Sequence, residues 1–162
     1  MLMPVDLRDA ETSDITNIAD IWHAQWHAGH AAVVPKELTA MRTHSSFLDR
    51  AEQHLARTRI TEADGKLAGF HMIKGDELFQ FYVSQQAQGR GVASVLMKDA
   101  EAKLLEAGIA RPFLACAIGN DRAAGFYRKT GWQSVGRHVE ELETADGPFH
   151  LEVWRFEKQI LP

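Results

Sequence analysis

Cysteine is nearly absent from this sequence of 162 residues, with Cys116 as its single example. One cysteine excludes a disulfide within the chain and fits a reducing, cytoplasmic setting. Long hydrophobic runs are also absent, since no stretch approaches the roughly 20 apolar residues that a membrane-spanning helix needs. The first residues, Met1 to Asp6, contain no basic segment followed by an apolar run, so we expect no signal peptide and no membrane partner.

The sequence also has fewer basic than acidic residues. Lysine and arginine number 18 against 22 aspartate and glutamate residues, which gives a formal charge of −4 with neutral histidines. This composition implies no basic surface, so we expect no nucleic-acid partner. The apolar fraction of 45% and the charged fraction of 25% are ordinary for a globular protein. The length predicts a single domain over residues 1–162.

Apolar spacing and turn residues predict the order of the elements. A first amphipathic helix should have Thr12 or Ser13 as its N-cap and should end near Gly29. The early strands are joined by short turns and should pair as antiparallel hairpins, whereas the later strand–helix–strand segment should form a parallel crossover. The fold class is therefore α/β with a mixed sheet. The predicted elements are strand 5–8, helix 13–29, a helical region over 37–57, strands 58–62, 67–73 and 77–83, helix 91–106, strand 113–118, helix 122–129, and strands 132–137 and 149–156.

The centre of the chain has the pattern of a strand, a glycine turn and a helix. An aromatic strand at 78–83 is followed by Gly89 and Gly91, and an amphipathic helix begins directly after them. A helix that begins at such a turn has several unpaired N–H groups, and glycine lets a ligand approach the backbone. Together they form an anion site, most often for phosphate or pyrophosphate. A dinucleotide-binding fingerprint is not met, because Ser94 stands at the third glycine position, and a Gly-Lys-Ser/Thr loop is absent.

Two segments carry a family resemblance. Residues Gln88 to Ala93, QGRGVA, resemble the Q/R-x-x-G-x-G/A signature of the GNAT superfamily of N-acetyltransferases. Residues Asn120 to Trp132, NDRAAGFYRKTGW, resemble the N-x-x-A-x-x-F-Y-x-x-x-G-F/W segment of the same family. The resemblance implies a GNAT-type, mostly antiparallel twisted sheet of about six to seven strands, flanked by four helices, with a splayed parallel strand pair in the centre.

The resemblance also implies a ligand. Acetyl-CoA would be the co-substrate, without a metal, and would lie where strands 78–83 and 113–118 diverge. Backbone groups of Phe81, Tyr82 and Val83 would pair with its pantetheine amides like an added strand. Asn120 would hydrogen-bond the pantetheine arm. Backbone N–H groups of the glycine turn would hold the pyrophosphate, namely those of Gln88, Gly89, Arg90, Gly91, Val92, Ala93 and Ser94.

The same resemblance implies an acetyltransferase reaction. The acetyl group would pass directly to a primary amine of a small molecule or peptide. Tyr127 would be the general acid that protonates the leaving CoA thiolate, and Glu77 would be the general base, directly or through a water. Simpler interpretations stay open: a core tyrosine for Tyr127, a solvated carboxylate for Glu77, a helix N-cap for Asn120, and a purely structural turn for residues 88–94.

The acceptor site has no transferable motif. The family resemblance places the first helix and the following loop beside it, so Trp26, His27 and His30 are candidate acceptor contacts. Trp22 and Trp26 are also expected in the core, because both belong to the apolar stripe of their helix. His23 and His27 lie one helical turn apart, but no further ligand set follows, so no metal site is predicted.

Other features leave alternatives open. The acidic run Glu140-Glu141-Leu142-Glu143 is expected to be solvated or to attract a cationic amine, and the net charge favours a cationic small acceptor. Cys116 is expected to be a small apolar filler rather than a nucleophile. One rival to the enzyme is a non-catalytic CoA-binding or sensing module on the same fold, and another is transfer of a longer acyl group. Pairing through the C-terminal strands would give a homodimer.

Overall fold

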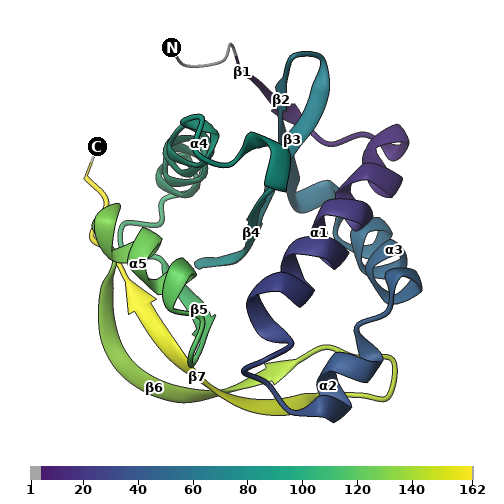
Figure 1. Cartoon of the computed structure of the whole chain (residues 1–162). Coiled ribbons are helices and arrows are strands. Elements are labelled where there is room, and N and C mark those ends of the chain that lie inside the picture. The colour runs from purple at the N-terminus through teal and green to yellow at the C-terminus, as the bar shows by residue number, and fades with distance from the viewer. Residues whose placement is uncertain (1–4, 162) are drawn as a thin grey trace.

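The computed structural model describes residues 5–161. The expectation of no signal peptide rests on Met1 to Asp6, and four of these six residues, Met1 to Pro4, lie outside the described part. Within it, seven strands form one sheet in the order β1-β2-β3-β4-β5-β7-β6 (Figure 1). The strands are β1 Val5–Asp9, β2 Thr58–Ala63, β3 Lys66–Lys74, β4 Glu77–Val83, β5 Phe113–Ala117, β6 Gln133–Leu142 and β7 Phe149–Glu157. The α-helices are α1 Ile15–His30, α2 Lys36–Met41, α3 His44–Gln53, α4 Val92–Glu106 and α5 Asp121–Lys129.

The mixed, mostly antiparallel sheet of the prediction is confirmed, with two differences in extent. The helical region predicted over 37–57 divides, because the Thr43 hydroxyl accepts a hydrogen bond from the Ser46 N–H at 3.1 Å and thereby caps α3. The strand predicted over 132–137 is longer, because β6 continues to pair with β7 as far as Leu142.

The start of α1 differs from the predicted cap at Thr12 or Ser13. Glu11 precedes a short 3-10 turn, and its side chain and that of Asp14 form a reciprocal capping box. α1 follows this turn directly. The predicted cap at Thr12 or Ser13 is therefore wrong. The capping side chains are the flanking carboxylates of Glu11 and Asp14, which can accept backbone hydrogen bonds as hydroxyl groups do.

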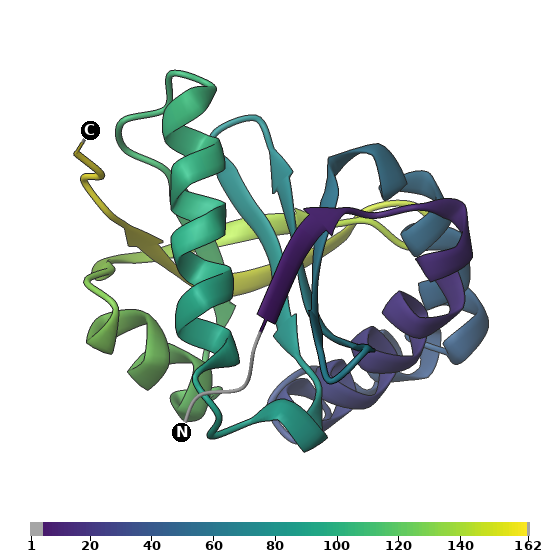
Figure 2. The same cartoon turned by 90° about the horizontal axis from the view of Figure 1, so that it is seen from above.

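The sheet separates two layers of helices. α1 and α3 pack together on one side, whereas α4 runs along the other face of β1–β4 and α5 lies beside the second half of the sheet (Figures 1 and 2). Each long helix buries one apolar stripe, as its sequence periodicity predicts. Among residues 5–161, no helix combines the length and apolar character required to cross a bilayer.

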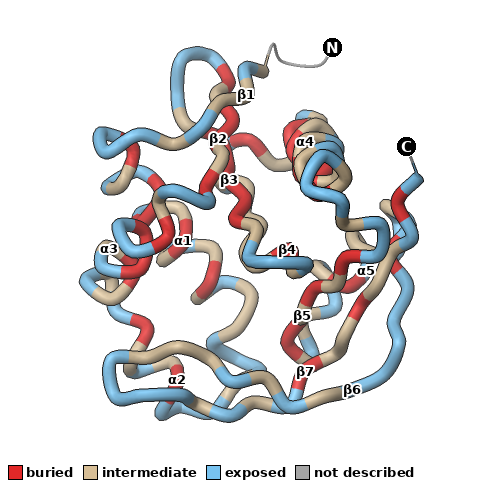
Figure 3. Tube along the Cα trace, turned by 180° about the vertical axis from the view of Figure 1, so that it is seen from behind, coloured by how far each residue is buried: buried red, intermediate tan, exposed pale blue. Residues whose placement is uncertain are grey.

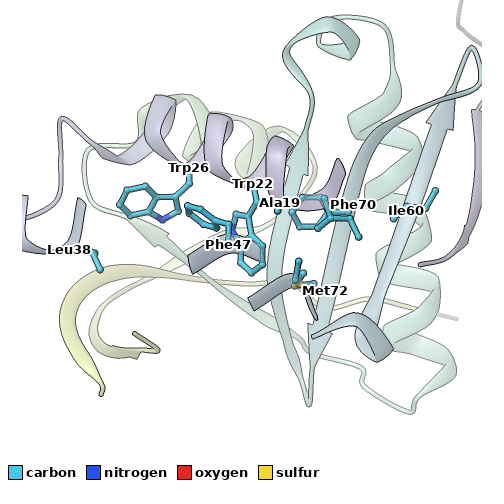
Figure 4. Close-up of a cluster of buried hydrophobic side chains, with 10 residues drawn as sticks. Ala19, Trp22, Trp26, Leu38, Phe47, Ile60, Phe70 and Met72 are labelled. Atoms are coloured by element: carbon cyan, nitrogen blue, oxygen red, sulfur yellow. The ribbon is translucent and has the colours of Figure 1, made fainter. Parts of the chain in front are cut away.

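Trp22 of α1 is central to the larger core. It is fully buried, and its ring centroid lies 5.3 Å from that of Phe47 on α3 and 5.7 Å from that of Phe70 on β3. Figure 4 shows these rings meeting between helix and sheet, with Met72 and Ile60 on the sheet side. The expected core role of Trp22 is confirmed. This packing holds α1, which forms one wall of the site, at a fixed place on the sheet.

A buried carboxylate joins the sheet to α4. Asp99 accepts hydrogen bonds from Arg59 at 2.9 and 3.0 Å and is bonded to the His71 Nε2 at 2.8 Å. Its side chain is 9% exposed and that of His71 is 1% exposed. Burial alone would raise the pKa of Asp99, but the hydrogen bonds from His71 and Arg59 outweigh burial and hold that pKa below its usual range. The three side chains fasten β2 and β3 to α4.

The centre of the sheet is open. β4 pairs with β3 along its whole length, but it pairs with β5 at one position only, Glu77 opposite Phe113. Beyond this pair the two parallel strands diverge, so the predicted splayed pair is confirmed (Figure 1). The β4 edge that faces β5 has no strand partner among the described residues. Such an edge presents N–H and C=O groups that an extended ligand can use.

β6 forms the outer edge of the second half of the sheet. Most of its residues are exposed (Figure 3), including Val135 at 48% and Val139 at 58%. The far end of the β6–β7 hairpin lies beside α2, as Figures 1 and 3 show from opposite sides. The hairpin therefore brings residues near 140 to the same region as the end of α2.

Candidate active site

A cleft with a volume of about 970 Å³ opens along the free edge of β4. Its walls come from the C-terminal half of α1, the diverging strands β4 and β5, the turn before α4, the start of α5, and β6. Three of the predicted site residues, His27, Arg90 and Val92, are not among its lining residues. The predicted residues that do line it are Trp26, His30, Glu77, Phe81, Tyr82, Val83, Gln88, Gly89, Gly91, Ala93, Ser94, Asn120 and Tyr127.

The turn before α4 depends on two glycines. Gly89 has a φ of 77° and Gly91 a φ of 83°, in the left-handed region that favours glycine. Gly91 is the N-cap of α4, so the N–H groups of the first helical turn have no acceptor within the helix. Because Gly91, Ala93 and Ser94 line the cleft, these donors and the positive end of the helix dipole lie at its wall. This arrangement fits a pyrophosphate group.

The two turn residues that do not line the cleft have other surroundings. Val92 is 1% exposed and packs in a small cluster with Ala63 and Ala68, which anchors the start of α4 to the sheet. Arg90 lines a separate pocket beside the β2–β3 turn. The side chains of both residues therefore point away from the cleft, and only their backbone groups remain for a ligand there.

The Gln88 side chain links three parts of the cleft wall. Its Nε2 donates to Oε1 of Gln25 on α1 at 2.9 Å, and its Oε1 accepts from Nη2 of Arg122 on α5 at 2.5 Å. The motif predicted Gln88 but neither partner, because their contact depends on α1 and α5 meeting at the turn. Gln25 and Arg122 both line the cleft.

Asn120 is placed by neighbours on two sides. Its Oδ1 accepts a hydrogen bond from the Ala123 N–H at 3.4 Å, so the alternative N-cap role is confirmed. On the other side lies Gly29 of α1, where an added Cβ would stand 3.0 Å from the Asn120 Nδ2. The missing side chain at Gly29 allows α1 to approach α5, and it leaves the Asn120 amide at the cleft wall.

Tyr127 lies in the cluster that fills the space behind the diverging strands. Its ring centroid is 5.8 Å from that of Phe126 and 5.9 Å from that of Phe156. Burial, with smaller contributions from Cys116 and Tyr82, raises the pKa of its hydroxyl well above the usual value. The hydroxyl is protonated at neutral pH, as in an unburied tyrosine, and can donate a hydrogen bond. Tyr127 is thus both a packed side chain and a lining residue of the cleft.

Cys116 is 4% exposed on β5, as a small apolar filler would be. Burial raises the pKa of its thiol to about 12. A thiol that stays protonated is a poor nucleophile. The expectation that Cys116 fills space is therefore confirmed.

Glu77 is half-buried at the single position where β4 and β5 pair. Burial raises the pKa of its carboxyl group to about 7, and the neighbouring Glu140 adds to the shift, whereas Lys74 opposes it. The interpretation of Glu77 as a freely solvated carboxylate is therefore wrong. A carboxyl group with this pKa exchanges protons readily at neutral pH, as a general base must.

Two of the three predicted acceptor contacts line the cleft. The Trp26 ring is 6% exposed and stacks on the His30 ring at 4.9 Å, and both line the cleft. Burial lowers the pKa of His30, so its ring is neutral at pH 7. His27 instead bonds through Nε2 to the Arg42 carbonyl at 2.6 Å. Within residues 5–161, no group of three or more His, Cys, Asp or Glu side chains is arranged to hold a metal ion.

The acidic run at the end of β6 and just beyond it is only partly solvated, which corrects the sequence-based expectation. The Glu141 side chain is 71% exposed, but that of Glu140 is 19% exposed. Glu143 accepts a hydrogen bond from Arg50 at 3.0 Å and is bonded to His54 at 2.7 Å. Burial opposes its ionisation, but these two hydrogen bonds lower the pKa of Glu143 to about 2.

Comparison with known proteins gives a consistent result. The sequence model of the Acetyltransferase (GNAT) family matches residues 15–132. The chain is 36% identical over 120 residues to an uncharacterized N-acetyltransferase of Mycobacterium tuberculosis, an alignment that covers 68% of this chain and 77% of the relative. It is 28% identical over 120 residues to a mycothiol acetyltransferase of Jonesia denitrificans, covering 70% of this chain and 37% of the relative.

Solved structures with this fold cover nearly the whole chain. A GCN5-related N-acetyltransferase from Rhodopseudomonas palustris superposes with a TM-score of 0.76 at 23% identity, covering 99% of both chains. The PaiA N-acetyltransferase from Thermoplasma acidophilum, solved in complex with coenzyme A, has a TM-score of 0.69 at 19% identity and covers 98% of this chain and 100% of that one.

Proposed function

This chain belongs to the GNAT family of acetyltransferases and is an N-acetyltransferase, and from this premise we propose how it holds its substrates and which residues act. The acetyl donor is acetyl-CoA, which lies along the free edge of β4. The acceptor is a primary amine of a small molecule or peptide, bound at the end of the cleft that Glu77 lines. Tyr127 acts as the general acid and Glu77 as the general base.

The free edge of β4 is the observation that carries this proposal. Residues 78–83 pair with β3 on one side and face the cleft with the other. The pantetheine arm contains two amides, and backbone groups of Phe81, Tyr82 and Val83 can bind them as they would bind a neighbouring strand. At one end of this edge stands the glycine turn of α4, which suits the pyrophosphate. Asn120 stands across the cleft and can hydrogen-bond the same arm.

The proton transfers assign Glu77 and Tyr127 different roles. An ammonium group has no lone pair, so the amine must lose a proton before it attacks the thioester carbonyl. Glu77 takes that proton, directly or through a water, because burial has brought its pKa to about 7. When the carbon–sulfur bond breaks, the hydroxyl of Tyr127 protonates the leaving CoA thiolate. The attacking nitrogen loses its second proton as the amide forms, and this proton restores the Tyr127 hydroxyl, so the products are the amide, the CoA thiol and one proton held by Glu77. No covalent enzyme intermediate is required.

Release of free CoA thiol tests this function. The protein is mixed with acetyl-CoA and a panel of primary amines, and thiol is followed with time, while CoA binding is measured separately by calorimetry. We expect thiol release that depends on both the amine and the protein. Tight CoA binding without release for any amine would instead support a non-catalytic CoA-binding module. Parallel reactions with propionyl- and succinyl-CoA test transfer of longer acyl groups, for which we expect lower rates.

Glu77→Gln should remove one limb of the pH profile. Because the base acts when deprotonated, kcat/KM of the wild type should rise with pH through about 7. The variant should be slower by roughly 10²-fold above pH 7 and should lack this inflection. Asp76→Asn is the matched control, since Asp76 is the exposed neighbour of Glu77. An inflection near pH 7 that persists in Glu77→Gln would exclude Glu77 as the base.

Stability provides a second measurement on Glu77→Gln. The folded-state pKa of Glu77 is raised from 4.5 to about 7, so ionisation costs the folded wild type free energy. The free energy of unfolding should therefore decrease as pH rises from 4.5 through 7, and the variant should lack this decrease. Urea unfolding of both proteins at pH 5 and pH 8 measures the difference.

Gly29→Ala should weaken acetyl-CoA binding. The new methyl group would stand 3.0 Å from the Asn120 Nδ2 and displace that amide from the cleft wall. We expect KM for acetyl-CoA to rise about three- to tenfold, the loss expected for roughly one hydrogen bond. The better helix propensity of alanine, up to about 1 kcal/mol, is opposed by this close contact and by the disturbed Asn120 cap of α5.

Gly125→Ala in α5 is the control for this substitution, because an added Cβ there meets nothing within 4 Å. It should change KM little. Equal KM values for the two variants would show that Asn120 does not depend on the space at Gly29.

A further inference from the structure

Arg42, at the end of α2, is a buried cation without a carboxylate partner. The residue is 3% exposed. Its Nη1 donates to the backbone carbonyl of Glu143 at 2.7 Å, and its Nε has no hydrogen-bond partner within residues 5–161. Its guanidinium lies 6.0 Å from the Trp26 ring centroid. No ion pair joins it to an acidic side chain of the described residues.

Arg50, on α3, is the second buried arginine of this region. It is 8% exposed, and its guanidinium lies 4.2 Å from the centroid of the Trp22 ring. Its Nε donates to Glu143 at 3.0 Å, whereas its Nη1 has no partner in the described part of the chain. Glu143 is also bonded to His54 at 2.7 Å. This one carboxylate therefore bonds Arg50 and His54, and Arg42 lies within reach of its charge but forms no ion pair with it.

A buried guanidinium without an ion-pair partner destabilises a fold. Removing such a charge from water costs several kcal/mol unless an anion and full hydrogen bonding repay it. Burial, followed by repulsion from Arg50, lowers the pKa of Arg42 to about 10, in agreement with this cost. A long apolar side chain would fill the same space at lower cost. The stability of the fold therefore does not explain an arginine at position 42, and a role in ligand binding would.

Arg42 lies at the wall of the cleft, where it can contact a ligand. Arg50 also lines the cleft, and so do Glu77 and Glu140 from β4 and β6. The acceptor end of the cleft thus has a basic wall from the α2–α3 region and an acidic wall from the sheet. A guanidinium binds a carboxylate through parallel N–H donors in one plane, a geometry that an ammonium group of lysine does not provide.

We propose that the amine acceptor also carries a carboxylate, which binds at Arg42 and Arg50 while its amine lies at Glu77. This inference rests on the proposed function, since it concerns the second substrate of that reaction. It replaces the expectation of a purely cationic acceptor, because Glu143 is committed to Arg50 and His54. The acceptor is then an amino acid or a compound with the same two groups.

Matched pairs of acceptors test the proposal. Amino acids with one to four carbons between amine and carboxylate are each compared with the corresponding primary amide, and thiol release gives kcat/KM for both. We expect the acid to exceed its amide by about 10- to 100-fold in the best pair, as charged hydrogen bonds predict. Turnover of amides and simple amines without any preference for the acids would overturn the inference and leave the proposed function intact.

Binding is measured separately, so that failure of the reaction does not hide the site. The CoA-saturated protein is titrated with the same acids and amides, and the shift in Tm is recorded. The acids should raise Tm and the amides should not. A rise with the acids but no thiol release would support the carboxylate site and contradict the proposed function. Equal shifts for acids and amides would contradict the site.

Arg42→Met distinguishes a ligand-binding role from a structural one. The ratio of kcat/KM between acid and amide should fall toward one, and the Tm of the protein without ligands should be unchanged or higher. Arg57→Met is the matched control, because Arg57 is exposed and does not line the cleft. It should retain the wild-type ratio. A lowered Tm together with an unchanged ratio in Arg42→Met would show that this arginine serves the fold alone.

Discussion

Tyr127→Phe will lower kcat by about 10²- to 10⁴-fold, the range that loss of a general acid produces. Phenylalanine fills the same volume among Phe126 and Phe156, so the fold and the cleft should be retained. The dissociation constant of CoA should change by less than about threefold, because phenylalanine retains the packing surface and one neutral hydrogen bond is worth little net. Steady-state thiol release and calorimetric CoA binding measure the two quantities.

The chain supplies its own control for this experiment, since it contains only two tyrosines. The other, Tyr82, also has a buried hydroxyl with a raised pKa and lines the same cleft. Tyr82→Phe should lower kcat by less than about tenfold, because the proposal uses only its backbone and losing one hydrogen bond costs about 1 kcal/mol. Equal losses in the two variants, or an unchanged rate in Tyr127→Phe, would remove Tyr127 from the proton transfer.

Asp99→Ala will lower the free energy of unfolding by roughly 3–5 kcal/mol, the usual cost of breaking a buried ion pair from one side. The substitution leaves the Arg59 guanidinium without its main acceptor and leaves His71, at 1% side-chain exposure, without a partner for Nε2. Urea unfolding at pH 7 measures the loss. Asp146→Ala, at an exposed turn, is the control and should change stability by less than about 0.5 kcal/mol.

The effect of Asp99→Ala should depend on pH. The folded-state pKa of Asp99 is lowered, so its contribution is present above the unfolded pKa of about 3.9 and is lost as the pH falls below it. The difference between wild type and variant should therefore be constant from pH 5 to 7 and should shrink below pH 4. A difference that stays constant down to pH 2 would mean that the loss comes from packing rather than from the ion pair.

Several parts of the candidate site could be predicted because their geometry is local. Gly89 and Gly91 stand directly before a helix, and this order alone predicts unpaired N–H groups at its start. Asn120 caps α5, and Tyr127 follows on the same short helix, so one contiguous segment carries both to the cleft. The divergence of β4 and β5 followed from the family resemblance rather than from any pattern in either strand.

Other parts could not be predicted because they depend on contacts between distant segments. Glu143 meets Arg50 across 93 residues, and this contact requires the β6–β7 hairpin to reach the helices of the N-terminal half. The pKa of Glu77 depends on its burial and on Glu140, which β6 brings near. Gln25 was missed for the same reason, since its helix repeats no pattern that would place it beside the glycine turn.

The single paired position of β4 and β5, Glu77 opposite Phe113, also has a mechanical consequence. Backbone pairing joins the two halves of the sheet, β1–β4 and β5, β7 and β6, at this position alone. An acyl donor that occupies the free edge of β4 would take the place of the missing ladder and couple the two halves. The stiffness of the sheet is then a property of the bound state, in which backbone amides near residues 78–83 exchange with solvent more slowly than in the free protein.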